Sequence, residues 1–392
     1  MSAITSLDPA PGSAITSATG GRSRIRILFL IDFVSSTGGA ERFAVGLASH
    51  LPADRFDVWV CSTRESDPRA ERQLAQAGVH HVNLGRRTKW DFYRLAGVAT
   101  LLRRQRFDIL HTHKFGSNVW GSLIGSACRV PVIVAHEHSW AYEGEPLRAW
   151  LDGRVIARLA TRVIAVSRAD ARRMVSVEGI PERKIVTISN GYVPANGSPA
   201  GDGLRSELGL TPRTPLIAVA ALLRPEKRLD LLLDAHARVL RTIPDAHLAI
   251  AGDGECRPQL ERQATELGLN GRVHFLGRRS DVDNILQTAD VAALTSDREG
   301  SPLLMFECMA SATPLVATDV GGIPDVVEHG ATGLVVPRRD PDSLAAALIS
   351  LLANPSLCAE IGAAARRKLD GYTIDATAAK FAELYETLVD RP

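Results

Sequence analysis

Short apolar runs and longer helical segments alternate along almost the whole chain, in two successive series. The first series begins at Ile25 to Ile31 (IRILFLI) and the second at Leu216 to Ala220, and a segment rich in Gly, Pro and Asn, Asn190 to Gly203, separates them. Because such alternation is typical of a parallel sheet covered on both faces, each series predicts one α/β sheet. A chain of 392 residues is long enough for two cores. The expected fold class is α/β, with two doubly wound, Rossmann-like domains.

The same alternation predicts where regular structure lies. After the first strand, the first series predicts a helix at 40–51 and alternating elements at 56–61, 69–77, 80–84, 91–105, 108–111, 117–127, 131–135, 163–166 and 185–188. In the second series we expect a helix at 229–240, strand-to-loop junctions at 248–254 and 273–277, a strand at 291–294 and a last helix at 372–389. In sheets of this class, ligands bind beyond the carboxyl ends of the strands.

The stretch from Ala292 to Pro337 combines a strand, a polar loop and a helix start. Its apolar beginning, up to Leu294, predicts a buried strand, after which the sequence turns polar. A helix is expected to begin at Pro302, which suits the first turn, and Ser301 can cap it. The residues that follow, up to Ala312, include neither Gly nor Pro. The helix is therefore expected to continue through them.

Two glutamates flank this helix start, with Glu299 at its mouth and Glu307 about one and a half turns inside. At a rise of about 1.5 Å per residue they lie roughly 12 Å apart, close to the length of a nucleotide diphosphate sugar from ribose to hexose. Between them, the free amides of Leu303 and Leu304 could hold a pyrophosphate. One carboxylate could accept hydrogen bonds from the sugar and the other from the ribose. The alternative is a pair of solvated glutamates on a surface helix.

Two further loops have the character of phosphate sites. Gly38 and Gly39 lie between the first strand and a helix, where backbone amides can approach an anion, although an ordinary tight turn gives the same pattern. In the second series, Arg224 and Lys227 follow a strand. Two cations there would offset the charge of a pyrophosphate held beside two carboxylates.

Two His-x-His pairs, His111 with His113 and His136 with His138, fall at the ends of neighbouring strands. Residues two apart on a strand face the same side, so four imidazoles could converge on a metal, as in metal-dependent hydrolases. Beyond Glu137, the acidic ligands and bases that such sites usually add are not evident nearby. Polar residues satisfied at strand ends would give the same pattern.

The glutamate stretch resembles the signature of retaining glycosyltransferases of the GT4 type (glycosyl transferase group 1), which have the two-domain GT-B architecture. The similarity includes the Glu-x7-Glu pair, Ala317 to Pro324 (ATDVGGIP) and Gly330 to Pro337 (GATGLVVP), and it extends from about Arg24 onward. The segment GGAERFAVGLA is similar to the family's N-terminal loop, which closes over the donor phosphates. The resemblance implies two domains that face a cleft, joined by a hinge at ISNG.

The domains expected on this basis are an acceptor-side domain at 24–190, a linker at 191–203 and a donor-side domain at 204–371. A helix within 372–392 would pack back on the first domain, and residues 1–23, rich in Ser, Ala, Thr, Gly and Pro, are expected to be a disordered tail rather than a signal peptide.

The resemblance implies roles for single residues. His113, Glu299 and Lys227 would be catalytic, and His138 would lie on the sugar or acceptor side. The expected donor-binding residues are Gly38, Gly39, Arg224, Lys227, Glu299, Gly300, Ser301, Leu303, Leu304 and Glu307. This chain has Ala221 to Leu223 where the common family pattern has Gly-Arg-Leu, so Arg224 could replace the missing arginine.

The implied activity is transfer of a hexose-type sugar with retention of anomeric configuration. The donor would be a UDP-sugar, or a GDP-sugar, and the acceptor a glycan, a lipid-linked glycan or a small molecule in cell-surface polysaccharide or glycolipid synthesis. No cofactor and no metal are expected, since Asp281 to Asp283, which imitates a metal-binding DxD motif, opens a helix and is interpreted as structural. The alternatives are the metal-dependent hydrolase, a catalytically silent sugar-nucleotide binding module, and a sugar-nucleotide epimerase.

Composition narrows partners and location. A net charge of +2 marks no nucleic-acid binder. Five scattered cysteines indicate buried thiols in a reducing compartment, and no apolar run approaches the roughly 18 residues of a membrane span. The expected location is the cytoplasm. The basic, aromatic stretch Arg86 to Arg106 could rest on an anionic membrane at the cytoplasmic face of the inner membrane, or it could simply cover the sheet.

Overall fold

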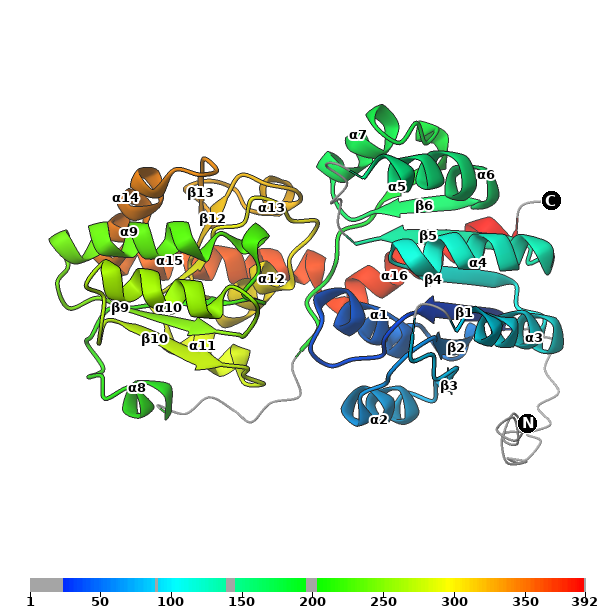
Figure 1. Ribbon diagram of the computed structural model, residues 1–392, viewed down its shortest axis with the longest axis horizontal. Helices are drawn as coiled ribbons and strands as arrows, with labels where there is room; N and C mark the ends of the chain where they lie inside the picture. Colours follow the sequence, from blue (N-terminus) through cyan, green and yellow to red (C-terminus); the bar gives the residue numbers. More distant parts are fainter. Residues whose placement is uncertain (1–23, 89–90, 139–144, 195–202, 391–392) are drawn as a thin grey trace.

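The computed structural model describes residues 24–88, 91–138, 145–194 and 203–390 (Figure 1). The described chain forms two parallel sheets, each with helices on both faces. The tail predicted at 1–23 and most of the predicted linker lie outside the described residues.

The first sheet has the strand order β3-β2-β1-β4-β5-β6-β7. Its strands are β1 (Ile25–Ile31), β2 (Phe56–Ser62), β3 (His80–Asn83), β4 (Ile109–His113), β5 (Val132–Glu137), β6 (Arg162–Ala165) and β7 (Ile185–Thr187). The helices between them are α1 (Gly39–His50), α2 (Pro68–Gln76), α3 (Ala96–Gln105), α4 (Phe115–Ala127), α5 (Pro146–Leu151), α6 (Ala157–Leu159) and α7 (Arg168–Ser176).

The second sheet has the order β10-β9-β8-β11-β12-β13. Its strands are β8 (Leu216–Ala220), β9 (His247–Ala251), β10 (Val273–Gly277), β11 (Val291–Leu294), β12 (Leu315–Thr318) and β13 (Leu334–Val336). Its helices are α8 (Gly203–Glu207), α9 (Leu229–Thr242), α10 (Arg257–Glu266), α11 (Val282–Thr288), α12 (Leu303–Ser311), α13 (Ile323–Val326), α14 (Pro341–Leu352) and α15 (Pro355–Lys368). The α/β, doubly wound fold predicted from the sequence is confirmed.

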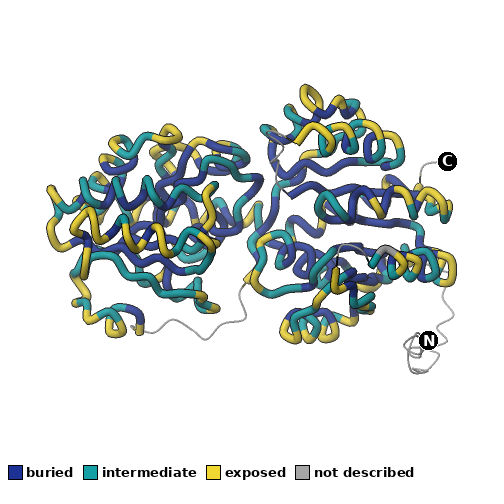
Figure 2. The backbone as a smooth tube through the Cα atoms, in the orientation of Figure 1, coloured by how far each residue is buried: buried dark blue, intermediate teal, exposed yellow. Residues whose placement is uncertain are grey.

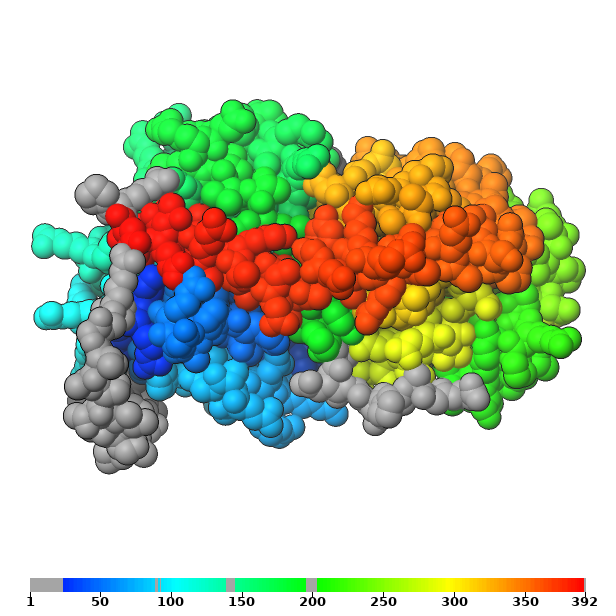
Figure 3. All heavy atoms as spheres, turned by 180° about the vertical axis from the view of Figure 1, so that it is seen from behind, coloured from blue at the N-terminus to red at the C-terminus, as the bar shows by residue number. Residues whose placement is uncertain are grey.

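Buried apolar strands form the centre of each half, and exposed positions lie on the outer helices (Figure 2). The last helix, α16 (Ile374–Val389), contacts α1 and buries Phe381 and Tyr385 completely against the first sheet. Figure 3 shows the segment from α15 to α16 running along one face of the molecule across both halves. The C-terminal helix therefore belongs to the core of the first sheet.

One sequence prediction about a helix start was wrong. Helix α12 begins at Leu303, and Ser301 makes no capping bond, because its hydroxyl lies 2.9 Å from the Ser189 hydroxyl and accepts from the Asn190 amide instead. A tertiary partner thus took the side chain that the local pattern assigned to the helix end. Asp281 does lie at the start of α11, as predicted, and its carboxylate accepts hydrogen bonds from the nearby Arg279.

The predicted ends of β4 and β5 were too early. Strand β4 continues to His113 and β5 to Glu137, with His113 paired to His136 in the parallel register. Both His-x-His pairs are buried here, so polarity did not end these strands.

Helix α3 buries Val98, Leu101 and Leu102 against the first sheet, which fits the sheet-covering interpretation of that stretch. Of the five cysteines, Cys61 and Cys308 are buried and the other three are half-buried, so the prediction of buried thiols was only partly right. In the described ranges, no single helix is long and apolar enough to cross a membrane, and one pair bent by 100°, α14 with α15 and its extension to Tyr372, passes by length and composition alone.

Candidate active site

The predicted site residues follow the strands at which the strand order of each sheet reverses. In the first sheet the order turns between β1 and β4, and the loops after these strands contain Gly38 and Lys114. In the second sheet it turns between β8 and β11, and the loops there contain Lys227 and Glu299. Ligands of doubly wound sheets bind at such switch points. The topology therefore gives a physical reason for a site where the sequence predicts one.

The loops of the two halves are in close contact. A Cβ added to Gly300 would lie 2.2 Å from the carbonyl oxygen of His138, so only glycine permits this approach. Gly321, at a φ of +54°, lets its own loop approach the Glu299 carbonyl in the same way. Glu299 is thus held directly beside the strand end that contains the histidines.

Lys227 and Glu299 form an ion pair, with Nζ 2.6 Å from Oε1. The same oxygen accepts a hydrogen bond from Ser296 at 2.5 Å. The Glu299 side chain is only 9% exposed and that of Lys227 25%. The arrangement places one cation and one carboxylate side by side in the loops that follow β8 and β11.

The start of α12 offers two backbone donors. Within the described residues, the amides of Leu303 and Leu304 have no hydrogen-bond acceptor, and both residues are nearly buried. A helix N-terminus with free amides and a partial positive charge favours an anion. These amides lie a few residues beyond Glu299, where the sequence placed them.

Glu307 is not free to meet a ligand in this structure. It is 4% exposed, and its Oε1 lies 2.6 Å from a guanidinium nitrogen of Arg42, on α1 of the other half. Burial raises the pKa of the Glu307 carboxyl, and Arg42 opposes that effect. Arg42 also donates to the Val193 carbonyl at 3.2 Å. A ribose that binds Glu307 must therefore share or displace Arg42.

The loop at Gly38 and Gly39 is tied to the histidine strand. A Cβ on Gly38 would lie 2.1 Å from a carboxylate oxygen of Glu41, whereas a Cβ on Gly39 would meet nothing within 4 Å. Glu41 forms an ion pair with Lys114 at 2.6 Å. Lys114 has a φ of 71°, which is strained for a residue with a side chain. Strained residues such as this one, directly after His113, are typical of functional sites.

Four histidines form a buried stack between Phe29, Phe43 and Phe381. His113 Nδ1 lies 3.0 Å from His138 Nε2, and the Tyr385 hydroxyl lies 2.6 Å from Nδ1 of His111. Both ring nitrogens of His136 lack a partner within the described residues, as does Nε2 of His113. Burial lowers the pKa of His113 to about 3 and holds that of the other three well below the usual value. All four imidazoles are therefore neutral near pH 7.

The stack also contains a group that could hold a metal ion. Nitrogens of His111, His113 and His136 come within 4.8 Å of one another, and this group includes no carboxylate. The rings of His111 and His136 lie only 5° from parallel, with centroids 5.3 Å apart, so they also pack against each other. The same imidazoles therefore fit either a packed stack or the zinc site of a metal-dependent hydrolase.

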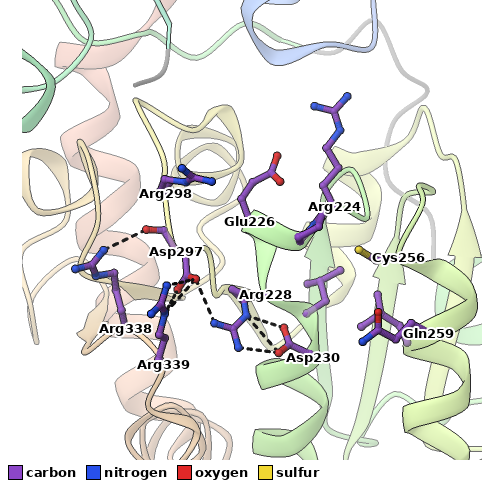
Figure 4. Close-up of a pocket in the computed structure, with 13 residues that line it drawn as sticks. Arg224, Glu226, Arg228, Asp230, Cys256, Gln259, Asp297, Arg298, Arg338 and Arg339 are labelled. Atoms are coloured by element: carbon purple, nitrogen blue, oxygen red, sulfur yellow. Dashed lines mark hydrogen bonds and ion pairs between the residues drawn. The ribbon is translucent and has the colours of Figure 1, made fainter. Parts of the chain in front are cut away.

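Arg224 shares a turn with Lys227, whose amide donates to its carbonyl at 3.0 Å, but it contributes to a different cavity. It lines a separate cavity of about 370 Å³ together with Arg298, Arg338 and Arg339, and neither Lys227 nor Glu299 lines that cavity (Figure 4). Ser301 binds Ser189 and Asn190 of the predicted hinge. The predicted set is thus divided between a ligand site, a hinge contact and a second cavity.

Sequence reasoning missed Arg42 and Lys114. Arg42 lies within the quoted segment GGAERFAVGLA, three residues after Gly39, on the first turn of α1. That position gave a signal, because the first turn of this helix faces the same loop. Nothing local marked Lys114, since its strain and its ion pair exist only in the folded chain.

Comparisons with known proteins identify the family of this chain. The model of Glycosyltransferase Family 4 matches residues 37–195, and that of Glycosyl transferases group 1 matches residues 202–368. A D-inositol 3-phosphate glycosyltransferase of Mycobacterium sp. (strain KMS) is 30% identical, over 81% of this chain and 78% of its own length. A UDP-Gal:alpha-D-GlcNAc-diphosphoundecaprenol alpha-1,3-galactosyltransferase of Escherichia coli is 26% identical, over 94% of this chain and 98% of its own.

Solved structures show the same fold. Anabaena HepE, in complex with UDP-glucose, superimposes with a TM-score of 0.80 at 24% identity, over 93% of this chain and all of its own. A glycosyltransferase from Rickettsia africae gives a TM-score of 0.78 at 19% identity, over 95% of this chain. The predicted GT-B fold is confirmed. The chain belongs to glycosyltransferase family 4, and it is a glycosyltransferase.

Proposed function

We propose that the enzyme transfers a hexose-type sugar from a nucleotide diphosphate sugar, a UDP-sugar rather than a GDP-sugar, with retention at the anomeric carbon. The observation that supports this best is the Lys227–Glu299 ion pair beside the free amides of Leu303 and Leu304. One ligand that carries both a pyrophosphate and sugar hydroxyls fits this combination of cation, amides and carboxylate. UDP-sugars also appear in the names of the E. coli relative and the HepE complex.

In this proposal the chain acts by positioning and electrostatics. Lys227 and the α12 amides stabilise the charge that develops on the leaving diphosphate, and Glu299 accepts hydrogen bonds from the sugar. The leaving phosphate deprotonates the acceptor on the same face, so no carboxylate nucleophile is needed. His113, held neutral by burial, presents Nε2 as a partner for a sugar hydroxyl. Because His113 is fully buried, the donor reaches it only when the contact of His138 with Gly300 opens.

The acceptor is proposed to be a glycan, a lipid-linked glycan or a small molecule, bound by the acceptor-side domain at 24–190 while the donor binds the domain at 204–371. The names of relatives with diphosphoundecaprenol and inositol phosphate acceptors support this range. We place the enzyme in the cytoplasm, in cell-surface polysaccharide or glycolipid synthesis. A peripheral membrane contact would use exposed side chains such as Tyr93, because the apolar face of α3 is already buried.

Donor hydrolysis and transfer measured with a panel of UDP-, GDP- and ADP-sugars test the proposal. We expect turnover with a UDP-sugar, unchanged by EDTA, and an anomeric product of the same configuration as the donor. Conversion of the donor sugar without any acceptor would identify an epimerase instead, and binding without turnover would identify a silent module. Loss of activity in EDTA that zinc restores would overturn the metal-independent mechanism.

A further inference from the structure

A second charged cluster shares its two loops with the predicted donor site. Lys227 pairs with Glu299, whereas the next residue, Arg228, pairs with Asp297 at 3.2 Å. Asp297 also accepts a hydrogen bond from Arg339 at 3.0 Å. Arg228, Asp297 and Arg339 line a cavity of about 370 Å³. Lys227 and Glu299 do not line it.

Positive side chains outnumber negative ones in this cavity. Five arginines and three carboxylates line it, an excess of two positive charges. Arg228 and Arg339 are already paired with Asp230 and Asp297. Arg298 and Arg224, by contrast, make no ion pair or side-chain hydrogen bond with a described residue, and Figure 4 draws no dashed line to either.

We propose that this cavity binds a phosphate group, at a site separate from the Lys227–Glu299 pair. A guanidinium with no carboxylate partner presents parallel N–H donors that match a phosphate oxygen pair. Arg338 can add a further donor, since its only described bond is a long one of 3.4 Å to the Asp297 carbonyl. The Glu226 carboxylate repels an anion, so the phosphate is expected near Arg298 and Arg338.

The same chemistry has two sources, a free inorganic phosphate or the phosphate of an organic molecule. The cavity is larger than a phosphate group needs, and Leu229 and Leu260 contribute apolar lining that could contact an organic body. The proposal stands on the arginines and does not require the proposed donor to be correct.

Calorimetric titration of inorganic pyrophosphate into the full chain with saturating UDP tests the proposal. UDP occupies the donor's phosphate positions, so binding that persists reports the second site. We expect Arg298→Gln and Arg338→Gln each to lower pyrophosphate affinity at least tenfold. Arg262→Gln, which removes an exposed α10 arginine outside the cavity, should leave it unchanged. Loss of pyrophosphate binding on addition of UDP, or wild-type affinity in both cavity variants, would overturn the proposal. If UDP does not bind, the comparison of variants still decides it.

Octyl phosphate and inorganic phosphate, titrated in the same way, distinguish the two sources. Equal affinities, both lowered by Arg298→Gln, support a site for free phosphate. Tighter binding of octyl phosphate, again dependent on Arg298, supports a phosphate monoester whose body occupies the cavity. If neither compound binds, the arginine cavity is not a phosphate site.

Discussion

The two sheets meet at their carboxyl ends with opposite chemistry. The first contributes four buried imidazoles, held neutral because unpartnered nitrogens cannot be charged away from water. The second contributes Lys227 and Glu299, which form an ion pair with Nζ 2.6 Å from Oε1. Both groups lie at the same topological position of a doubly wound sheet. Topology therefore sets where a site lies, and the side chains decide whether it holds charge or excludes it.

Removal of the positive charge of Lys227 should have the largest effect on activity. Lys227→Met leaves Glu299 uncompensated and removes a charge from the leaving diphosphate, so kcat/KM should fall by about 10²–10³-fold, or roughly 2.7–4 kcal/mol. Lys368→Met is the matched control, since it removes a lysine 2.5 Å from Glu328 outside the site. Steady-state kinetics of both variants, with thermal melts to check folding, decide the matter. Equal activities in the two variants would refute a role for Lys227.

The two glutamates should fail in different ways, because they hold different parts of one ligand. Glu307→Ala should weaken UDP binding by about tenfold or more, roughly 1.4 kcal/mol, whereas Glu299→Gln should bind UDP nearly as wild type but turn over more slowly. Calorimetry with UDP and steady-state kinetics measure the two effects. Equal loss of UDP affinity in both variants would contradict the assignment.

Arg42 provides the control for Glu307. Breaking this buried ion pair from either end should lower the free energy of unfolding, by up to about 3–5 kcal/mol. Arg42→Met should share that loss with Glu307→Ala yet bind UDP at least as tightly as wild type, since it frees the carboxylate. If Arg42→Met loses as much UDP affinity as Glu307→Ala, the ion pair acts only through the fold.

The variant Gly39→Val tests whether the loop at Gly38 and Gly39 contacts the donor phosphates. Its φ is not positive and a Cβ there would meet nothing within 4 Å, so Gly39→Val should fold normally. If the loop contacts the donor phosphates, activity should drop about tenfold, which corresponds to about 1.4 kcal/mol. Gly371→Val, at a glycine with equally open surroundings, is the control. Wild-type activity in Gly39→Val would show that this loop does not contact the donor.

The fold and the order of its elements were predictable from the sequence, because the strands of a parallel sheet covered on both faces are continuous apolar runs. The loop positions of Lys227 and Glu299 followed from those strands. Side-chain partners did not follow: the carboxylate of Glu307 faces Arg42, distant in the chain, and the Ser301 hydroxyl faces the predicted hinge instead of its own helix. Sequence reasoning also ended β4 before His113, since it treats histidine as polar, whereas neutral imidazoles here pack like aromatic rings.

The smallest expected effect concerns the buried histidine stack of the first sheet. It is a change in how the free energy of unfolding depends on pH. Burial, and then the neighbouring His138, His113 and His111, hold the pKa of His136 well below its value of about 6.5 in the unfolded chain.

Below about pH 6.5, His136 therefore binds a proton in the unfolded state but not in the folded state. The free energy of unfolding falls as the pH falls for this reason. For His136 alone the loss between pH 7.5 and 6.0 is about 0.8 kcal/mol. His136→Leu removes this contribution of His136 to the pH dependence. The substitution leaves the partners of His113 and His111 in place, and Phe43 and Phe381 can still pack against the new side chain.

Urea unfolding of both proteins at pH 7.5 and pH 6.0 should therefore show a difference in stability that is smaller in His136→Leu by about that amount. Other histidines titrate equally in both proteins and cancel. The same pH dependence in both would mean that His136 becomes protonated inside the fold, and the neutral stack would then not be neutral.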